Sequence, residues 1–267
     1  MAVATEAITV RQLSKTYATR DGAVTALDRT TFGIVEGEFV AVVGPSGCGK
    51  STLLKILAGI LPASSGEALL RGTLIAGPRR DISVVFQSPV LFPWRTVLDN
   101  VLLPVDVQRL SRERHHQTGV DLLALVGLKG FERKYPWELS GGMQQRVAIT
   151  RALVHDPAML LMDEPFGALD AMTREHMNLE LQRIWLERRK TVLFITHSIP
   201  EAVFLADRVL VMTARPGRLL DDVRVKLPRP RPLDVMNTPE FGAYARHIRH
   251  LFNVQGRIEG LQVTGTP

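Results

Sequence analysis

The chain has 267 residues, of which 45% are hydrophobic and 22% charged, and its mean hydropathy is +0.06. These values are ordinary for a globular protein and exclude intrinsic disorder, collagen-like repeats and long coiled coils. No apolar run approaches the roughly 18–20 residues that a membrane span needs, and the opening MAVATEAITVRQ lacks the basic and apolar regions of a secretory signal. The single cysteine excludes an intramolecular disulfide and is typical of a reducing compartment. We therefore expect a soluble intracellular chain.

The positive charge is concentrated in the C-terminal part of the sequence. The formal net charge is +6, yet residues 208–267 hold 10 Lys and Arg against 5 Asp and Glu, whereas residues 1–207 hold 23 against 22. The tail alternates Arg with Pro, as in LPRPRPLD, and lacks the interleaved aromatics of a nucleic-acid interface. We expect a solvated arm close to a membrane surface or a partner protein, and no nucleic-acid partner.

The first third of the chain is predicted to consist of strands and turns around one helix. Residues 7–13 alternate apolar and polar side chains, as a half-buried strand does, and residues 39–43 are the continuous apolar run of a buried strand. Residues 51–61 carry apolar side chains at helical spacing and are followed by Pro62 and a Ser-Ser-Gly turn. Residues 82–86 are a second short apolar run, which predicts another strand.

Helical spacing dominates from about residue 89 to residue 152, and strands then return. The helices predicted in this block cover residues 97–107, 111–128 and 143–154. Two buried strands follow, at residues 158–162 and 192–195, and a polar helix at residues 173–190 is predicted between them. This alternation predicts an α/β fold with a parallel sheet and an inserted helical subdomain. After residue 216 the chain is predicted to be irregular, with one short helix near residues 240–252.

A phosphate-binding sequence lies between the second strand and the first helix. Residues 44–52 read GPSGCGKST and contain the pattern G-x-x-x-x-G-K-S/T. Its glycines permit close approaches that a Cβ would block, so that successive N–H groups form an anion nest at a helix N-terminus. Lys50 is expected to reach the β- and γ-phosphates, and Ser51 to offer its hydroxyl to Mg²⁺. The residues predicted to bind the nucleotide here are Gly44, Pro45, Ser46, Gly47, Cys48, Gly49, Lys50, Ser51 and Thr52.

Cys48 lies inside this loop, at a helix N-terminus and two residues before Lys50. A neighbouring cation and a helix N-terminus both favour a reactive thiol. We therefore predict that alkylating agents inactivate the protein and that ATP protects it. The alternative interpretation is that Cys48 is only a small spacer.

Two carboxylates end the strand predicted at residues 158–162, where the sequence reads AMLLMDE. Carboxylates at the end of a buried strand are costly unless a cation or hydrogen bonds compensate them. Asp163 is predicted to hold Mg²⁺ opposite the phosphate loop, and Glu164 to act as general base for a water that attacks the γ-phosphate. The alternative is a strand end followed by a helix cap.

Residues 139–146 read LSGGMQQR, and this octapeptide resembles the signature sequence of ATP-binding cassette (ABC) proteins. Ser140 and the two glycines precede a predicted helix, which makes a second exposed helix N-terminus suited to an anion. The resemblance implies that two cassettes pack head to tail, so that Ser140, Gly141 and Gly142 of one contact the γ-phosphate held by the other. It therefore implies a homodimer that binds two ATP molecules with Mg²⁺.

The other motifs of the family occur in the family's order. The resemblance implies that Tyr17 stacks on adenine, although a strand aromatic in the core is the alternative. It implies that Gln87 contacts Mg²⁺ and the attacking water, and that His197 senses the γ-phosphate. Asp170 ends the stretch GALD, which resembles the loop linking the two cassettes, and it is assigned to nucleotide binding. The predicted catalytic residues are thus Glu164, His197 and Gln87, and the metal-binding residues are Ser51, Gln87 and Asp163.

The resemblance covers roughly residues 7–225. It implies a P-loop NTPase (RecA-like) core with an N-terminal antiparallel β region and an inserted α-helical signature subdomain at residues 88–152. We assign residues 1–225 to the ABC ATPase domain and residues 226–267 to a basic, Pro-rich tail with one short helix.

Two longer stretches resemble the ABC importers of nitrate, sulfonate, taurine and related solutes: LFPWRTVLDNV and MDEPFGALDAMTREHMNLELQRIW. This implies an ATPase peripheral to the cytoplasmic face of the inner membrane, bound to two integral membrane permease subunits. A periplasmic or lipid-anchored substrate-binding protein would act with them indirectly. Residues 92–94, Phe-Pro-Trp, are expected to form a groove for a short permease helix, with burial in the helical subdomain as the alternative.

Two other classes of protein are the alternatives to an importer subunit. A soluble ABC ATPase that acts on nucleic acid or ribosomes usually carries two cassettes or a long coiled-coil insertion, and this sequence has neither. A P-loop kinase or GTPase has no use for LSGGMQQR, and a guanine-specific N-K-x-D loop is missing.

Overall fold

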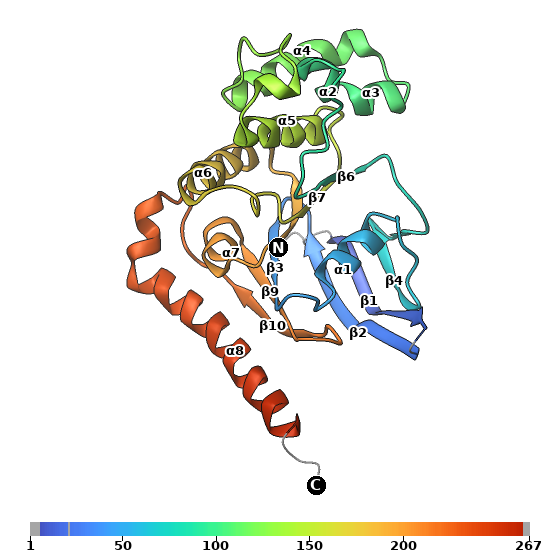
Figure 1. Ribbon diagram of the computed structural model, residues 1–267, viewed down its shortest axis with the longest axis vertical. Coiled ribbons are helices and arrows are strands. Elements are labelled where there is room, and N and C mark those ends of the chain that lie inside the picture. The colour runs from blue at the N-terminus through green and yellow to red at the C-terminus, as the bar shows by residue number, and fades with distance from the viewer. Residues whose placement is uncertain (1–5, 21, 264–267) are drawn as a thin grey trace, which may run out of the picture.

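The computed structural model describes residues 6–20 and 22–263, with side chains as far as residue 254. A six-stranded sheet with the order β10-β9-β3-β8-β7-β6 forms its centre (Figure 1). All neighbouring strands are parallel except β10, which pairs antiparallel with β9. The strands are β3 (Phe39–Val43), β6 (Ile82–Val85), β7 (Met159–Asp163), β8 (Thr191–Ile195), β9 (Arg208–Met212) and β10 (Leu219–Arg224). Every residue of β3, β8 and β9 is buried, which is why these strands are continuous apolar runs.

A smaller antiparallel sheet, with the order β2-β1-β4-β5, lies beside the central one. Its strands are β1 (Glu6–Thr19), β2 (Gly22–Val35), β4 (Ser65–Leu70) and β5 (Thr73–Leu74). Helix α1 (Lys50–Leu57) shares one hydrophobic core with both sheets, in which Leu27, Leu53 and Leu193 are fully buried. This packing fixes the helix that carries the phosphate loop against two layers at once.

The inserted helices form a separate layer at one end of the molecule, drawn in green in Figure 1. They are α2 (Val97–Val101), α3 (Leu103–Val107), α4 (Arg112–Leu125) and α5 (Gly141–Leu153), with a 3-10 turn η1 (Pro136–Glu138). The single helix predicted at residues 97–107 is wrong, because α2 and α3 are separate helices. Pro104 in the first turn of α3 cannot donate the backbone hydrogen bond that would continue α2.

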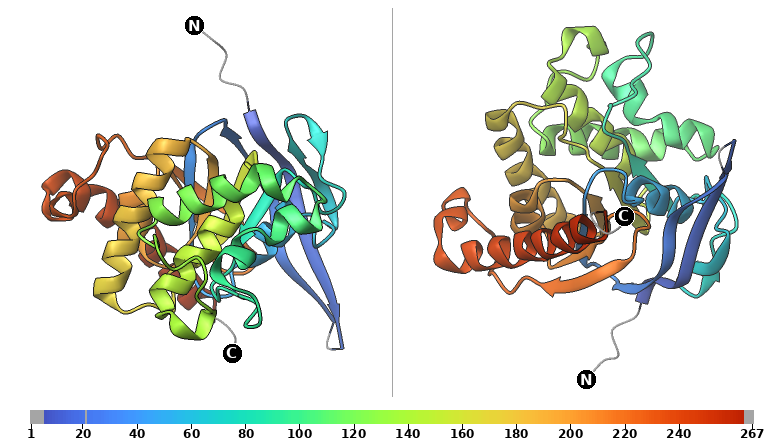
Figure 2. Two further views of the ribbon diagram at one scale, coloured as in Figure 1. Left: turned by 90° about the horizontal axis from the view of Figure 1, so that it is seen from above. Right: turned by 60° about the horizontal axis from the view of Figure 1, so that its bottom comes forward.

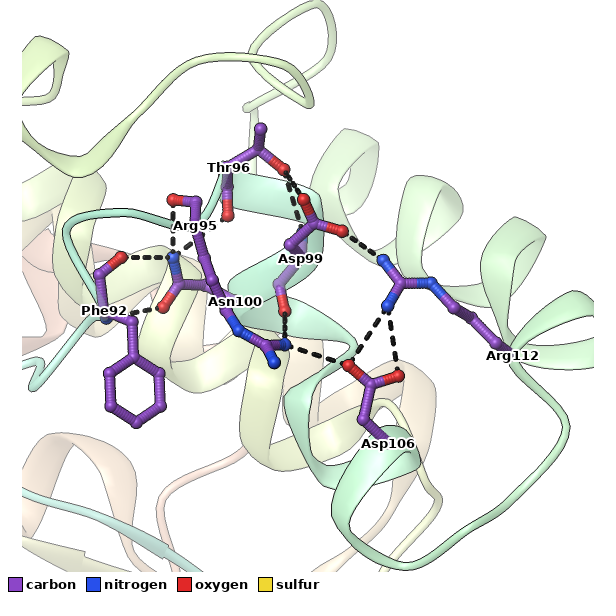
Figure 3. A network of polar contacts seen from close by, with 7 residues as sticks. All are labelled: Phe92, Arg95, Thr96, Asp99, Asn100, Asp106 and Arg112. Atoms are coloured by element: carbon purple, nitrogen blue, oxygen red, sulfur yellow. Dashed lines mark hydrogen bonds and ion pairs between the residues drawn. The ribbon is translucent and has the colours of Figure 1, made fainter.

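A fully buried asparagine holds the turn that precedes α2 (Figure 3). Asn100 Oδ1 accepts from Phe92 N at 2.8 Å, and Nδ2 lies within 3.0–3.1 Å of the carbonyl oxygens of Phe92, Arg95 and Thr96. Its amide therefore replaces the hydrogen bonds that this irregular backbone cannot form with itself.

Ion pairs join the helices α2, α3 and α4 next to this turn. Asp106 accepts from Arg95 Nη1 at 2.9 Å and from Arg112 Nη1 at 3.1 Å, and Arg112 also bonds Asp99 (Figure 3). The network is partly exposed, so each pair adds little by itself, but together they fix α2, α3 and α4 relative to one another.

Helices α6 (Ala171–Arg188) and α7 (Ile199–Leu205) pack on the central sheet, and the chain then continues through the turn η2 (Leu233–Asn237) into α8 (Pro239–Val263). Helix α8, red in Figures 1 and 2, lies beside β10, where His247 Nε2 is 2.8 Å from Asp221 Oδ2. It has 25 residues, so the short helix predicted at 240–252 is only part of it.

The basic segment before α8 differs from the solvated arm that its composition indicates. Arg231 is only 1% exposed and donates to the carbonyls of Val203, Phe204 and Ala206 at 2.8–2.9 Å. Arg229 lies over the Trp185 ring at 4.4 Å. The C-terminal carbonyls of α7, which lack partners within the helix, thus attract cations into the core.

Candidate nucleotide-binding site

The phosphate loop connects β3 to α1, as the sequence predicts. Gly47 and Gly49 have φ values of +76° and +99°, which glycine adopts without strain. A Cβ on Gly49 would lie 2.6 Å from the Ala26 carbonyl oxygen, so a larger residue would push the loop away from β2. Lys50 is 7% exposed, and its Nζ donates to the carbonyls of Gly44 at 2.8 Å and Pro45 at 3.0 Å. Its ammonium therefore lies inside the curve of the loop.

A cleft of about 300 Å³ opens over this loop. Its lining residues are Tyr17, Val24, Ala26, Ser46, Gly47, Gly49, Lys50, Ser51, Thr52, Glu164 and Arg215. Tyr17 lies in the wall of the cleft and its hydroxyl is 3.3 Å from Thr52 Oγ1, which answers the alternative that it is a core aromatic. The cleft thus offers an aromatic ring at one wall and an anion nest at its floor, as a nucleotide requires.

Asp163 at the end of β7 and Ser51 at the start of α1 meet next to the cleft. Ser51 Oγ donates to Asp163 Oδ1 at 3.2 Å. Burial raises the pKa of Asp163, and the hydrogen bond from Ser51 opposes that shift. A hydroxyl and one carboxylate beside a phosphate site fit Mg²⁺, which binds few protein oxygens and completes its octahedron with phosphate and water. Within the described residues, no group of three or more His, Cys, Asp or Glu side chains is arranged to hold a metal ion.

Glu164 and His197 lie together at this edge of the sheet. His197 Nδ1 is 3.1 Å from Glu164 Oε2, and Glu164 also lines the cleft. The backbone of Glu164 adopts φ +46°, a left-handed conformation that costs a non-glycine residue about 1–3 kcal/mol. Hydrogen bonds from Glu164 N to Ile195 O, 2.9 Å, and from Gly167 N to Glu164 O, 3.0 Å, hold it in this conformation. The strand β8 and the turn after β7 therefore aim the carboxylate jointly.

Gln87 and Asp170 lie on the loops that surround this pair. Gln87 is exposed, and its Nε2 is 2.9 Å from the position that a Cβ on Gly167 would take, so this glycine admits the amide. Asp170 caps α6, accepting from Thr173 N at 3.0 Å. Hydrogen bonds from the Thr173 backbone and side chain lower the pKa of Asp170. Neither residue lines the cleft, so the structure brings them near the Glu164 turn without placing them against the nucleotide space.

The signature residues occupy a different surface. Ser140 caps α5 by accepting from Met143 N at 3.3 Å, and Gly141 begins the helix. Ser140 and Gly142 line a second hollow of about 320 Å³, together with residues of α6, and none of the three signature residues lines the cleft over the phosphate loop. The structure therefore separates the two predicted anion sites within one chain.

The thiol of Cys48 is completely buried, at 0% exposure. It lies under the loop, 3.8 Å from Lys50 Nζ, and joins the core formed by α1 and the two sheets. This burial argues against the raised reactivity that the sequence predicts for Cys48, which stays a prediction for alkylation to test. A helix N-terminus indicates where the backbone N–H groups point, but not whether the side chain faces solvent.

One charged residue of the cleft, Arg215, belongs to none of the motifs found in the sequence. It belongs to the turn between β9 and β10, neither of which was predicted. The only signal was an arginine in the stretch TARPGR directly after an apolar run.

Comparison with known proteins identifies the family. The ABC transporter family matches residues 27–167, more than half of the chain. An uncharacterized ABC transporter ATP-binding protein of Methanocaldococcus jannaschii is 49% identical over 242 residues, covering 91% of this chain and 90% of that protein. The aliphatic sulfonates import ATP-binding protein SsuB of Bacillus cereus is 40% identical, covering 94% and 98%. The taurine import ATP-binding protein TauB of Rhizobium johnstonii is 47% identical, covering 89% and 93%. The chain belongs to the ABC transporter family.

Solved structures agree with this assignment. A bacterial ABC transporter cassette, solved as a dimer, superposes with a TM-score of 0.72 at 33% identity and covers 83% of this chain and 100% of its own. The same cassette in a post-hydrolysis state with ADP and Pi also gives a TM-score of 0.72, at 32% identity. These matches confirm the predicted fold class, family and ABC-type ATPase class, and they give no support to an ATPase acting on nucleic acid.

Proposed function

We propose that this chain is the ATP-hydrolysing subunit of an ABC importer. The observation that carries the proposal is the contact between Glu164 and His197 at the wall of a cleft whose floor is the phosphate loop. A phosphate loop by itself explains how a cleft binds a nucleotide, but not how the nucleotide is hydrolysed. A carboxylate held by a second side chain at the same place adds a group that can accept a proton.

In this function the loop N–H groups and Lys50 hold the triphosphate, while Tyr17 supports the adenine. Ser51 and Asp163 would hold Mg²⁺, which supplies charge neutralisation for the β- and γ-phosphates when bound. Glu164 accepts a proton from the water that attacks the γ-phosphorus, the bond from that phosphorus to the bridging oxygen breaks, and ADP leaves. His197 keeps the Glu164 carboxylate oriented for this transfer. From the adjoining loops, Gln87 would contact Mg²⁺ and the attacking water, and Asp170 would take part in nucleotide binding.

The active form we propose is a homodimer. The hollow at Ser140 and Gly142 lies apart from the cleft of the same chain, so the signature helix meets a γ-phosphate only if a second copy supplies it. The dimeric cassette structure with which this chain superposes supports such an arrangement. Exposed Met172, at 75%, lies beside Asp170 on the start of α6 and offers apolar surface for the same contact.

We propose that two permease subunits bind the helical subdomain, at the cytoplasmic face of the inner membrane. The sulfonate and taurine relatives described above are import ATP-binding proteins. Trp94 and Val90 are 70% and 59% exposed, and Phe92 lies 5.1 Å from Trp94 between ring centroids, which gives an apolar surface beside Gln87. No helix in the described part of the chain is long and apolar enough to span a bilayer. A substrate-binding protein would deliver a small solute such as a sulfonate, taurine or nitrate.

The proposed catalytic role is tested with Glu164→Gln. We expect kcat for ATP hydrolysis to fall at least about 100-fold, because a general base contributes about 10²–10⁴-fold, while affinity for ATP is unchanged. Glu187→Gln, an exposed glutamate on α6, is the matched control and should keep wild-type activity. Equal activity of Glu164→Gln and the wild type would refute the assignment.

The proposed dimer is tested by light scattering of the Glu164→Gln protein after size-exclusion chromatography. We expect a dimer with MgATP and a monomer without nucleotide. Changing Ser140 to Arg in the same protein should abolish the dimer, because a long side chain would fill the anion site. A dimer that survives this change would contradict the composite site.

A further inference from the structure

Arg215 is the one cleft-lining cation, among the described residues, that belongs to none of the predicted motifs. It lines the cleft together with Tyr17 and the loop residues Ser46 and Gly47. Its Nε is 3.4 Å from the Gly47 carbonyl oxygen, and its Nη2 lies 3.4 Å from the position of a Cβ on Gly47. The guanidinium therefore lies directly against the glycine-rich half of the phosphate loop.

The turn that carries Arg215 is internally fixed. Thr213 N donates to Arg218 O at 2.9 Å, and Thr213 Oγ1 accepts from Arg218 N at 2.9 Å. The same hydroxyl lies 2.8 Å from the Pro216 carbonyl oxygen. These bonds close the turn on both sides, so the backbone of Arg215 has a defined position.

The turn is also docked onto the loop and onto β2. Gly217 N donates to Ala26 O, and Asp28 N donates to Gly217 O, each at 2.9 Å. A Cβ on Gly217 would lie 1.9 Å from the carbonyl oxygen of Cys48, so this contact depends on glycine. Close packing of backbone on backbone keeps Arg215 at a constant distance from the anion nest.

The charge of Arg215 is available to a ligand. Its side chain is exposed, and within the described side chains it forms no ion pair with a carboxylate. Arg218, three residues later, differs, because its Nε donates to Asp28 Oδ2 at 2.8 Å. A guanidinium presents paired N–H donors whose geometry matches phosphate oxygens, and such charge-assisted bonds are the strong ones.

We propose that Arg215 is a second phosphate-binding cation of the nucleotide site, acting on the nucleotide of its own chain. It rests on the proposed function, since the ligand is the ATP that this function hydrolyses. Lys50 holds the phosphates as a buried point charge within the loop, and Arg215 closes over them from the β9–β10 turn. The residue thus determines affinity for the di- and triphosphate, whereas Tyr17 determines affinity for the base.

The test measures binding of ADP and of the β,γ-imido analogue of ATP by titration calorimetry in Mg²⁺, and of adenosine by competition. We expect Arg215→Ala to weaken both phosphorylated ligands about tenfold, which is the order of one charge-assisted hydrogen bond. Adenosine should compete as well as with the wild type. Arg215→Lys should recover part of the loss, because it keeps the charge but not the paired donors. Arg218→Ala is the matched control from the same turn, and we expect wild-type affinity.

Two results would overturn the inference: affinity of Arg215→Ala for both phosphorylated ligands within twofold of the wild type, or an equal loss for adenosine. A loss shared by Arg218→Ala would assign the effect to the turn and would also overturn it. If the wild-type chain itself bound neither phosphorylated ligand, the proposed function would fail instead, so the two failures are distinguishable.

Discussion

Replacing Arg231 by Ala tests whether the basic segment before α8 belongs to the fold or to the solvent. The Arg231 guanidinium is buried and donates to three carbonyl oxygens at the end of α7, those of Val203, Phe204 and Ala206. Its backbone N–H donates to Gln182 Oε1 at 2.7 Å, and its carbonyl accepts from Gln182 Nε2 at 2.8 Å. Burial lowers the pKa of Arg231 to about 10, which records the cost of holding the charge there.

The size of the effect follows from the groups that the substitution leaves unpaired. A buried acceptor without a partner costs about 1–3 kcal/mol, so the three carbonyls of α7 at the lower limit give about 3 kcal/mol. The carbonyl of Leu227 also accepts from Arg231 Nη2, at 3.1 Å, but this residue is partly exposed and is left out of the sum. The variant no longer has to bury a charge, which makes the loss of stability smaller, whereas the cavity left by the missing side chain makes it larger. We therefore expect the free energy of unfolding to fall by about 3 kcal/mol, which for a chain of this size lowers Tm by roughly 6–12 °C.

The assay is thermal unfolding followed by circular dichroism, with urea unfolding as a second measure. Arg249→Ala, an exposed arginine on α8, is the matched control and should change stability by less than about 0.5 kcal/mol. A Tm of Arg231→Ala within about 1 °C of the wild type would refute the argument, since it would mean that water reaches those carbonyls.

Three further outcomes follow from buried or crowded groups. Burial raises the pKa of Glu201 while the hydrogen bond from Thr196 opposes the shift, so its folded-state pKa exceeds the unfolded one and stability is lost as pH rises through that interval. We therefore expect the free energy of unfolding of Glu201→Gln, measured relative to the wild type in urea, to be higher at about pH 8 than at about pH 4. The same difference in unfolding free energy at both pH values would contradict this. Mass spectrometry should show Cys48 alkylated in the urea-unfolded chain but hardly at all in the native one, and rapid native labelling would mean that the loop opens. Gly217→Ala should weaken ATP binding at least about tenfold by moving its turn off the loop, and unchanged affinity would show that the turn is not needed.

The parts of the fold that the sequence predicts are those whose environment is uniform. Strands β3, β7 and β8 lie within a residue of the predicted ranges, because a strand buried on both faces must be a continuous apolar run. Strand β10 lies at the edge of the sheet, and only one of its six residues, Val223, is buried. Its sequence LLDDVR does not alternate apolar and polar residues, so no local pattern distinguishes it from a loop. Its pairing with β9 is a long-range contact.

The candidate site divides in the same way. Lys50, Asp163 and Glu164 were predictable, because phosphate, Mg²⁺ and proton transfer require particular groups next to a strand end or a helix start. His197 was predicted from the resemblance to the ABC family. The part each one has in binding or hydrolysis remains a prediction for the variants above to test. Arg215 was not predictable, because what brings it to the cleft is the docking of a turn onto backbone far away in the sequence.

The C-terminal charge excess shows why counting charges along a sequence says little about partners. Arg208 is 9% exposed, with Glu38 at 3.0 Å and Asp222 at 2.7 Å, so its charge is neutralised inside the sheet. Arg231 is buried under α7, and Arg229 pairs with Asp207. These three arginines stabilise the fold and contribute little field outside it, because buried and paired charges do not steer a distant partner. The cations of this region that face solvent include Arg224, Lys226, Arg246 and Arg249, and only such exposed charges can act on a distant partner.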